Sequence, residues 1–406
     1  MEERIIKHMI NYDKDKVFFW LEINKDSLLA RIKCTVRYIL RCSLRKQLIN
    51  DIDLSKDNIF FMSDKRSDYI GFFNEVYNQC NYSKGILEIT RIKTINLSNY
   101  ILLIKNIKLL FKINKKELLK IAKECLELDL SRVKFGLLEK LYIYSNLISL
   151  FEFESLIDNL KCKRNIIVFA DTKPLEGVLV KKANSKGINT ITMQHAIFSD
   201  NLNLQSVNIL NYLNVPSKNI LVWGTMTKAL FLKYNPKLNI HVLGNPILRN
   251  IEKAIKENTI GIVLDIPEMF AYNQKLIDIV CNIAIEHNKV IIIRKHPADI
   301  KNKYVINYNN ILFNKNLDEA YFIVGHTSTM VFTYLSQGCK VLQYRSDLIY
   351  NRLSESLTFE NIKELRSKIK NIESLDFSNA VKRDITYIGE ESKILYKQFF
   401  DKINEI

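Results

Sequence analysis

Proline and glycine are scarce in this sequence of 406 residues, which contains six prolines and eleven glycines. The first 170 residues have no proline and only three glycines, a composition that favours long helices. All six prolines lie between Pro174 and Pro297. We therefore expect the irregular backbone that forms binding sites to concentrate in this middle part of the chain.

Cysteine is also sparse, and the seven cysteines are scattered without a Cys-x-x-Cys pair. This spacing argues against a metal site made of thiolates, and the length of the chain argues against a disulfide framework. No segment approaches about 18 consecutive apolar residues, and the N-terminal residues lack the apolar core of a signal peptide. We expect reduced thiols and a cytoplasmic location without a membrane span.

Acidic residues are outnumbered by basic ones, and the formal net charge is +16. Such a charge favours phosphate-bearing ligands, anionic lipid or nucleic acid as partners, although a general enrichment in Lys, Asn and Ile accounts for part of it. Two stretches, 27–49 and 101–123, have the pattern of basic amphipathic helices. They predict either peripheral contact with the inner face of an anionic membrane or ordinary solvated surface helices.

From residue 165 onward, apolar runs of strand length alternate with helical patterns. Since one core rarely exceeds about 250–300 residues, the chain is expected to form two doubly wound α/β lobes with parallel sheets facing across a cleft. The predicted division is a first lobe at 1–225, a second lobe at 226–376 and a final helix at 377–406. The segment 225–257 is interpreted as the passage between the lobes, and 17–23 as a first strand.

Two apolar runs of the second lobe end in polar residues. Arg294, Lys295 and His296 follow the first run, and the helix predicted after the second run begins at a Thr-Ser-Thr cluster, 327–329. Ligands bind at the carboxyl ends of strands in open parallel sheets, and a helix start offers N–H groups to an anion. This arrangement suits a nucleotide as the leaving group. It has cations and an imidazole on one side, and on the other side N–H groups that can bind a phosphate. The same hydroxyls could also serve only as helix caps.

In the first lobe, a predicted strand ends at Asp171 and the next one at Gln194 and His195. Either Asp171 or His195 could serve as a general acid or base. Each also has a structural alternative, since Asp171 could cap the following helix and His195 could pack beside Gln194.

Three motifs give the chain a resemblance to the GT-B glycosyltransferases that build bacterial capsule and O-antigen. They cover roughly residues 160–345 and are the block VFADTKPLEGVLVKKANSKGINTITMQHAIF, the pair ILVWG and HVLGNPIL, and the pair RKHPAD and GHTSTMVFTYLSQGCKVL. The last pair is also similar to motifs of HP-motif sialyltransferases and CDP-glycerol glycerophosphotransferases. The resemblance implies metal-independent transfer from a nucleotide-sugar donor without a further cofactor.

Site residues are carried over from the matching motifs. The predicted catalytic residues are His195, Asp171 and His296. The predicted donor-binding residues are Lys295, His296, Gly325, His326, Thr327, Ser328, Thr329, Gly244, Asn245 and Gly224. The predicted acceptor-binding residues are Thr172, Lys173 and Gln194. No metal ligands are predicted, because the Asp-x-Asp patterns at 13–15 and 51–53 lie in polar segments far from the motifs.

Two positions depart from the family pattern. Ala196 stands where the family has the glycine of Gln-His-Gly, and Thr333 stands where many members have a glutamate that holds the ribose hydroxyls. Thr333 cannot accept two hydrogen bonds as a carboxylate does, which favours a donor of the CMP or CDP type or a different way of holding the ribose.

The leading functional hypothesis is transfer of a sugar to a lipid-linked or growing surface polysaccharide. The alternative within the fold is a phosphotransferase that uses a CDP-linked polyol such as CDP-glycerol. An epimerase would share the fold without needing basic helices, and a relative without catalysis is a further alternative. Nucleic-acid binding is remote, because the basic residues lack interleaved aromatic side chains and no reading motif occurs.

Overall fold

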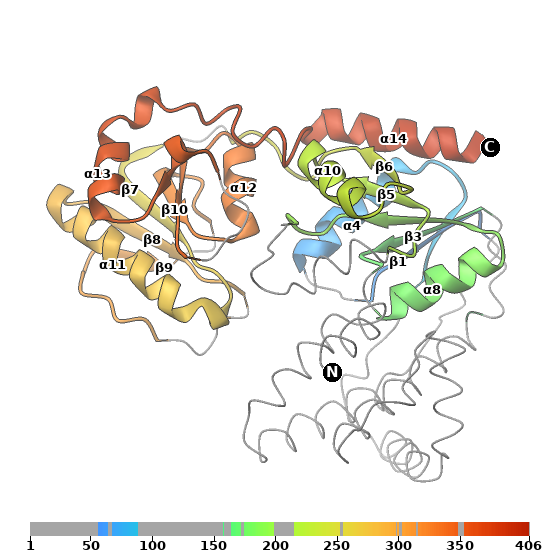
Figure 1. Cartoon of the computed structure of the whole chain (residues 1–406), viewed down its shortest axis with the longest axis horizontal. Helices are drawn as coiled ribbons and strands as arrows, with labels where there is room; N and C mark the ends of the chain where they lie inside the picture. Colours follow the sequence, from blue (N-terminus) through green and yellow to red (C-terminus); the bar gives the residue numbers. More distant parts are fainter. Residues whose placement is uncertain are drawn as a thin grey trace, which may run out of the picture.

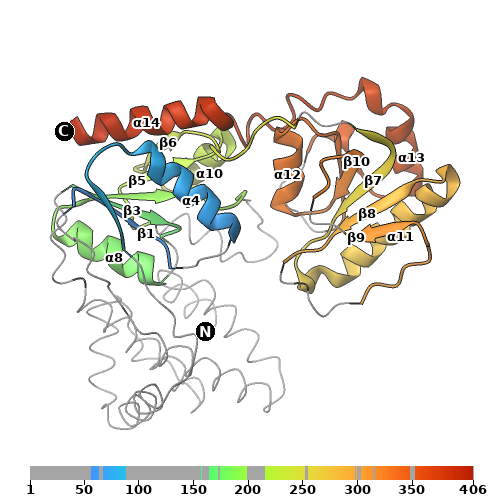
Figure 2. The same cartoon turned by 180° about the vertical axis from the view of Figure 1, so that it is seen from behind.

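The computed structural model of the protein describes residues 56–63, 67–87, 157, 164–171, 174–198, 215–251, 255–297, 299, 303–313, 316–347 and 353–405. They form two lobes, each built on a six-stranded sheet whose strand pairs are all parallel (Figures 1 and 2). The expected pair of doubly wound α/β lobes is thus confirmed. The predicted strand at 17–23 and both basic stretches lie outside the described residues, so the membrane contact stays a prediction.

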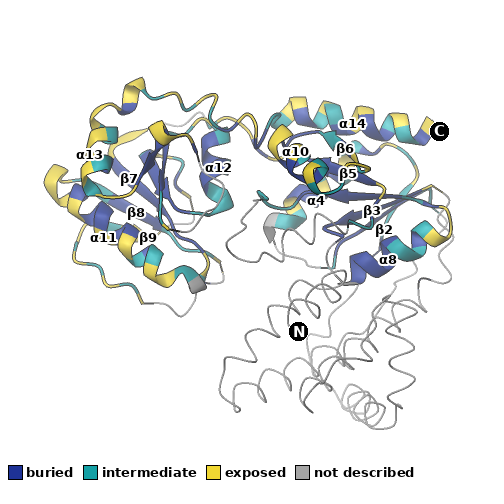
Figure 3. Cartoon of the chain, viewed as in Figure 1, coloured by how far each residue is buried: buried dark blue, intermediate teal, exposed yellow. Residues whose placement is uncertain are grey.

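The first lobe has the strand order β2-β1-β3-β4-β5-β6. Its strands are β1 (Asn58–Phe61), β2 (Lys84–Leu87), β3 (Asn165–Phe169), β4 (Asn189–Met193), β5 (Asn219–Val222) and β6 (Asn239–Val242). Its helices are α4 (Ser67–Gln79), α8 (Pro174–Ser185) and α10 (Thr225–Tyr234). β1, β3 and β5 are buried along their whole length, as expected for apolar strands covered on both faces (Figure 3).

The second lobe has the strand order β12-β11-β10-β7-β8-β9. Its strands are β7 (Lys256–Val263), β8 (Val290–Arg294), β9 (Ile311–Phe313), β10 (Ala320–Gly325), β11 (Val341–Tyr344) and β12 (Thr358–Phe359). Its α-helices are α11 (Phe270–His287), α12 (Thr329–Ser336) and α13 (Ile362–Lys370), with short 3-10 turns at Pro267–Met269, Glu355–Leu357 and Ile372–Ser374. Asn288 takes a left-handed conformation (φ 48°) and ends α11.

The last helix, α14 (Gly389–Glu405), returns to the first lobe and packs beside α4 (Figure 1). Tyr396 and Phe400 on its inner face are fully buried. The sequence predicted a helix from residue 377, but residues 377–388 are not helical. They cross between the lobes, and the backbone hydrogen bonds they make to the first lobe replace those of a helix.

An amide ladder runs across the first sheet, formed by the asparagine that begins each of five strands. Each side chain donates to the one before it, over 2.8 Å, 2.7 Å, 2.8 Å and 2.6 Å, through Asn58, Asn165, Asn189, Asn219 and Asn239. Asn404 of α14 accepts from both Asn58 and Asn165, over 3.1 Å and 3.2 Å. The ladder therefore attaches the C-terminal helix to the sheet.

The junction between the lobes depends on two glycines without room for a side chain. A Cβ atom on Gly224 would lie 2.2 Å from the Arg383 carbonyl oxygen, and one on Gly244 would lie 2.1 Å from that of Tyr387. Asn245, which is 3% exposed, donates its backbone N–H to Tyr387 over 2.9 Å. All three were predicted donor-binding residues, and the structure places them where the final segment crosses between the lobes.

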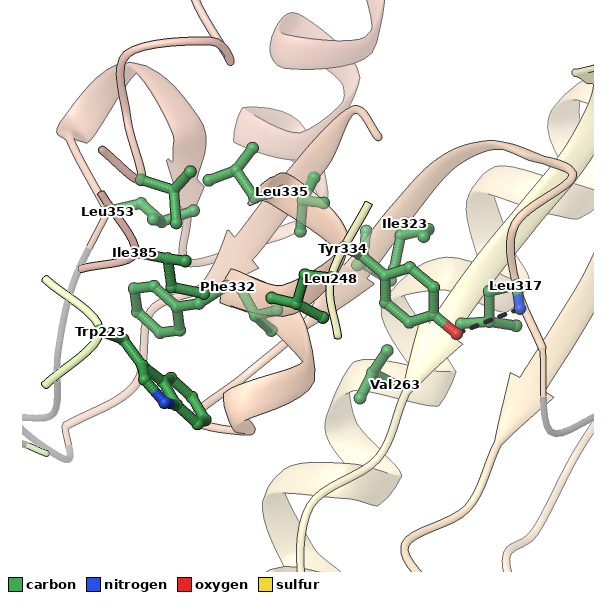
Figure 4. Packing of buried hydrophobic residues seen from close by; sticks show 14 of the residues in the cluster. Trp223, Leu248, Val263, Leu317, Ile323, Phe332, Tyr334, Leu335, Leu353 and Ile385 are labelled. Atoms are coloured by element: carbon green, nitrogen blue, oxygen red, sulfur yellow. Dashed lines mark hydrogen bonds between the residues drawn. The ribbon is translucent and has the colours of Figure 1, made fainter. Parts of the chain in front are cut away.

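One buried cluster continues through this junction. Trp223, which follows β5, belongs to the same cluster as Phe332 of α12 and Ile385 of the crossing segment (Figure 4). The predicted passage at 225–257 is too long, because α10 and β6 belong to the first lobe and β7 already begins the second sheet at Lys256. The first sheet thus continues beyond the predicted boundary at 225, and α14 packs as part of the first lobe.

Asp384, at the same junction, is 7% exposed, and no hydrogen bond reaches its carboxylate within the described chain. Burial raises its pKa from the ordinary value of 3.8 to about 6. Because the folded pKa lies above the unfolded one, the wild type loses stability as the pH rises from about 4 to about 6. Asp384→Asn should stabilise the protein by about 3 kcal/mol at pH 7.5 and bring no gain at pH 3.5.

Urea denaturation at the two pH values tests this expectation. Asp376→Asn is the control, because Asn379 and Ser378 donate to the exposed Asp376 and hold its pKa below the ordinary value. That substitution should lower stability at neutral pH or leave it unchanged. An Asp384→Asn variant that is no more stable than the wild type at pH 7.5 would show that the buried carboxylate carries no such penalty.

Candidate functional site

The strand order of each sheet locates a topological switch point, where ligands bind in open parallel sheets. In the second sheet the chain passes from β7 to β8 and β9 on one side and then returns to β10 on the other side of β7. In the first sheet, β2 and β3 lie on opposite sides of β1. A ligand site is therefore expected at the carboxyl ends of β7 and β10 and at those of β1 and β3.

Asp265, just after β7, connects the two strand ends at the second switch point. One of its carboxylate oxygens accepts from His326 Nδ1 over 3.1 Å, from the Thr327 N–H over 2.9 Å and from the Thr327 hydroxyl over 2.8 Å. Asn273 of α11 fixes the Asp265 backbone by accepting its N–H over 2.9 Å. Asp265 is 3% exposed. Its role was not predicted from the sequence, where an acidic residue after an apolar run was the only signal.

His326 continues this network on the other side of its ring. Its Nε2 lies 2.8 Å from the hydroxyl oxygen of Ser346, which follows β11. The ring of Tyr272 stacks on the imidazole at 5.2 Å and 23°, and the ring of Tyr344 lies 5.4 Å away. His326 is 2% exposed. His326, which follows β10, is therefore held by groups from the ends of β7 and β11 and from the start of α11.

At the start of α12, only part of the predicted anion site is available to a ligand. Ser328 caps the helix by accepting the Met330 N–H over 3.3 Å. Thr327 already donates both its N–H and its hydroxyl to Asp265, so the predicted phosphate contact of Thr327 would have to displace a carboxylate. In the described part of the chain, the N–H groups of Ser328 and Thr329 have no hydrogen-bond partner. These two groups remain as the donors for an anion.

Gly325, predicted as a donor contact, lets α12 approach the sheet. A Cβ atom at Gly325 would lie 2.5 Å from Val331 Cγ2. Arg294, at the end of β8, donates to the Tyr334 hydroxyl of α12 over 2.9 Å. That hydroxyl also accepts the Leu317 N–H over 3.2 Å (Figure 4). The two predicted halves of the site, which follow β8 and β10, are thus joined by a direct hydrogen bond.

Lys295 and His296 are half-buried and follow β8 directly. The ammonium of Lys295 lies 5.1 Å from the ring centre of Tyr304 and 5.8 Å from that of Phe313. The turn closes where the Asp299 N–H donates to the His296 carbonyl over 2.8 Å. The structure therefore holds Lys295 and His296, both predicted donor-binding residues, at the carboxyl edge of the second sheet.

In the first lobe, Asp171 is buried rather than open to an acceptor. Ala170 has a φ of 65°, and this left-handed residue turns the chain after β3. The Asp171 N–H donates to Thr192 Oγ1 over 3.0 Å, and its carboxylate accepts the Ser217 N–H over 3.2 Å. Burial raises the pKa of Asp171 to about 6, against the lowering effect of Ser217. The Asp171 carboxylate thus bonds to the backbone just before β5.

Gln194 and His195 have different surroundings. Gln194, predicted to contact the acceptor, is 1% exposed; its amide oxygen accepts the Trp223 N–H over 2.6 Å, and its amide nitrogen donates to the Ala196 carbonyl over 2.8 Å. Its amide thus joins the ends of β4 and β5. His195 is half-buried among the aromatic rings of Tyr69, Phe169 and Phe198, at 6.1 Å, 6.0 Å and 5.4 Å.

Glu176 is a further buried carboxylate that the sequence did not indicate. It is 0% exposed and accepts the N–H and the hydroxyl of Ser63 over 2.7 Å and 2.9 Å. Ser63 follows β1, so this contact joins the switch point of the first sheet to α8. Thr172 and Lys173, the other predicted acceptor contacts, lie outside the described residues.

Within the described ranges, no group of three or more His, Cys, Asp or Glu residues could hold a metal ion. No helix in that part of the chain is long and apolar enough to span a membrane.

No protein-family model matches the sequence, and no curated protein sequence matches it either. Solved structures do match in fold. An S. aureus MnaA–UDP co-structure has a TM-score of 0.53 and 12% identity, covering 86% of this chain and 98% of that chain. The two-lobed fold is GT-B. The UDP-GlcNAc 2-epimerase from Neisseria meningitidis, bound to UDP-GlcNAc, has a TM-score of 0.52 and 13% identity. The match covers 85% of this chain and 100% of that chain.

A third match is the UDP-GlcNAc 2-epimerase from Methanocaldococcus jannaschii in complex with UDP-GlcNAc and UDP. It has a TM-score of 0.51 and 13% identity, covering 86% of this chain and 99% of that chain. At such identities the likeness concerns the fold, which confirms the fold class expected from the sequence motifs. The activity of the site depends on its own residues and not on the fold.

Proposed function

We propose that the protein binds a nucleotide-activated sugar at the carboxyl edge of the second sheet and transfers the sugar to an acceptor held by the first lobe. The observation that carries this proposal is the pair of N–H groups on Ser328 and Thr329, which have no partner in the described chain. They lie at the start of α12, next to the switch point, on the same sheet edge as Lys295 and His296. This combination suits a phosphate group.

The chemistry follows from where charge develops during transfer. The bond between the anomeric carbon and the phosphate oxygen breaks, and the departing nucleotide gains negative charge. The N–H groups of Ser328 and Thr329 and the positive end of the α12 dipole would stabilise that charge, with Lys295 as a fixed cation. His296 would donate a hydrogen bond or a proton to the phosphate. In this proposal, no divalent ion takes part.

On the acceptor side, a hydroxyl attacks the anomeric carbon and loses its proton. His195 is the group we assign to accept this proton, since it follows β4 at the carboxyl edge and imidazole takes up protons near neutral pH. Asp171 is assigned a structural role, because its carboxylate is bonded to Ser217. The aromatic rings around His195 give the acceptor side an apolar surface, which fits a saccharide or a lipid-linked saccharide. Contact of the acceptor with an anionic membrane is part of the same proposal.

Epimerisation of a nucleotide sugar is the second candidate, because two of the similar solved structures are UDP-GlcNAc 2-epimerases. An epimerase requires no acceptor, so release of free nucleotide only when an acceptor is present would favour transfer. Transfer of a polyol phosphate from a CDP-linked donor would instead release CMP, which the same assay detects.

Substitution of His296 tests the donor site directly. His296→Ala should weaken nucleotide binding and lower turnover by roughly 100-fold, because it removes the donor to the leaving phosphate. Calorimetric titration with CMP, CDP, UDP and GDP measures binding, and nucleotide release measures turnover. Lys256→Ala is the control, since Lys256 is an exposed cation at the first residue of β7, on the opposite edge of the sheet. If none of the four nucleotides binds the wild type, the proposed function is wrong.

A further inference from the structure

Three side chains at the second switch point form a continuous line of hydrogen bonds that the nucleotide proposal does not use. The Asp265 carboxylate lies 3.1 Å from His326 Nδ1, and His326 Nε2 lies 2.8 Å from Ser346 Oγ. A hydroxyl, an imidazole and a carboxylate in this order are the constituents of a nucleophilic relay, which is recognised by its geometry and not by its sequence order.

The partners of Asp265 determine the tautomer of His326. The carboxylate oxygen that faces His326 Nδ1 also receives the N–H and the hydroxyl of Thr327, so it acts as an acceptor. The proton of the neutral imidazole therefore belongs on Nδ1, where it is donated to Asp265. Nε2 is then left with a lone pair, which accepts the hydroxyl proton of Ser346. This is the direction that a general base requires.

The imidazole is also held in position. Tyr272 stacks on the ring of His326, and the Gln343 amide donates to the His326 carbonyl over 2.8 Å. The Tyr272 hydroxyl in turn donates to Asp347 over 3.0 Å. Asp265 and His326 are 3% and 2% exposed, whereas Ser346 is half-buried. The relay thus has a buried acid, a buried and oriented base, and a half-buried serine.

We propose that Ser346 is an activated nucleophile and that the second lobe carries an acyl-transfer activity towards ester substrates. Ser346 Oγ attacks the ester carbonyl carbon while its proton passes to His326 Nε2, and Asp265 stabilises the resulting imidazolium. The C–O bond to the alcohol then breaks, and the leaving oxygen takes the proton from His326. Water, deprotonated by His326, releases the acid from Ser346, and the proton restores the serine hydroxyl.

The test uses the full chain and a serine-directed fluorophosphonate probe, followed by mass spectrometry of the labelled peptide. A phosphonyl adduct is expected on Ser346, with fluoride as the leaving group. Ser354 is the control, because its hydroxyl lies 2.8 Å from that of Ser356, in an exposed position without an imidazole. Ser346 should react about 100-fold faster than Ser354. Equal rates at both serines, or no adduct on Ser346, would overturn the proposal.

A cysteine pair provides a second measurement that needs no ester substrate. Ser346→Cys should be alkylated by iodoacetamide at least about 10-fold faster than Ser354→Cys at pH 7, because His326 would take up the thiol proton. Adding His326→Gln or Asp265→Asn should remove this difference, and a thermal melt of each variant shows whether it is folded. If the two cysteines react at the same rate, Ser346 is a structural hydroxyl. Neither experiment depends on nucleotide binding.

Discussion

Replacing Asn165 with alanine is expected to destabilise the first lobe by about 3 kcal/mol. The side chain is 1% exposed and lies inside the amide ladder, with a ladder partner on each side. Its loss leaves the Asn189 amide nitrogen without its acceptor at 2.7 Å and the Asn58 amide oxygen without its donor at 2.8 Å. A buried polar group without a partner keeps its full desolvation cost. Urea denaturation followed by circular dichroism measures the change.

Asn239→Ala is the matched control for this prediction. Asn239 stands at the end of the ladder, is exposed, and makes one ladder bond, to Asn219 over 2.6 Å. Its removal should lower the free energy of unfolding by less than about 1 kcal/mol, because water can replace the lost partner. If Asn165→Ala and Asn239→Ala lower the free energy of unfolding by the same amount, burial does not determine how strongly the ladder stabilises the lobe.

Gly244→Ala is expected to disrupt the lobe junction and to cost roughly 3 kcal/mol or more. Gly244 has a φ of 79°, and an added Cβ atom would lie 2.1 Å from the Tyr387 carbonyl oxygen and 2.6 Å from its carbonyl carbon. Both neighbours are backbone atoms, so no side-chain movement relieves the clash. The Asn245 hydrogen bond to Tyr387 should be lost with it. Limited proteolysis should show faster cleavage between β6 and β7.

The control for this substitution is Gly338→Ala. Gly338 also has a positive φ, of 88°, but no atom lies within 4 Å of the position of its Cβ. The substitution should lower the free energy of unfolding by only about 1 kcal/mol, which is the strain of an alanine in a left-handed conformation. A Gly244→Ala variant with the stability and the protease resistance of Gly338→Ala would show that the junction tolerates a side chain.

Most strands after residue 165 could be predicted because each is a short apolar run between polar or turn-forming residues. The predicted strands at β3, β4, β5, β7, β8, β9, β10 and β11 all occur. β1 and β2 were not predicted, since four-residue runs such as Asn58–Phe61 carry little periodicity. Their identity as strands depends on pairing with β3 and with each other. The asparagine that begins each of five strands is the feature of the sequence that marks the amide ladder.

The carboxyl ends of β8 and β10 were predictable as a site because parallel strands bring them to one edge. The partners of the polar side chains there were not. His326 bonds to Asp265, 61 positions earlier, and to Ser346, 20 positions later. In the same way, Gln194 and Thr327 have the residue types of ligand contacts, yet their donors bind groups of the chain itself. Only the packing of distant segments determines which donors remain for a ligand.

The return of α14 to the first lobe has a consequence for the order of events during biosynthesis. Residues 58–242 supply all six strands of the first sheet, and they are translated long before Asn404. Until then the amide groups of Asn58 and Asn165 lack one acceptor, and the surface beneath Tyr396 and Phe400 is uncovered. The nascent first lobe must therefore wait for the whole second lobe to be translated before it can complete its packing.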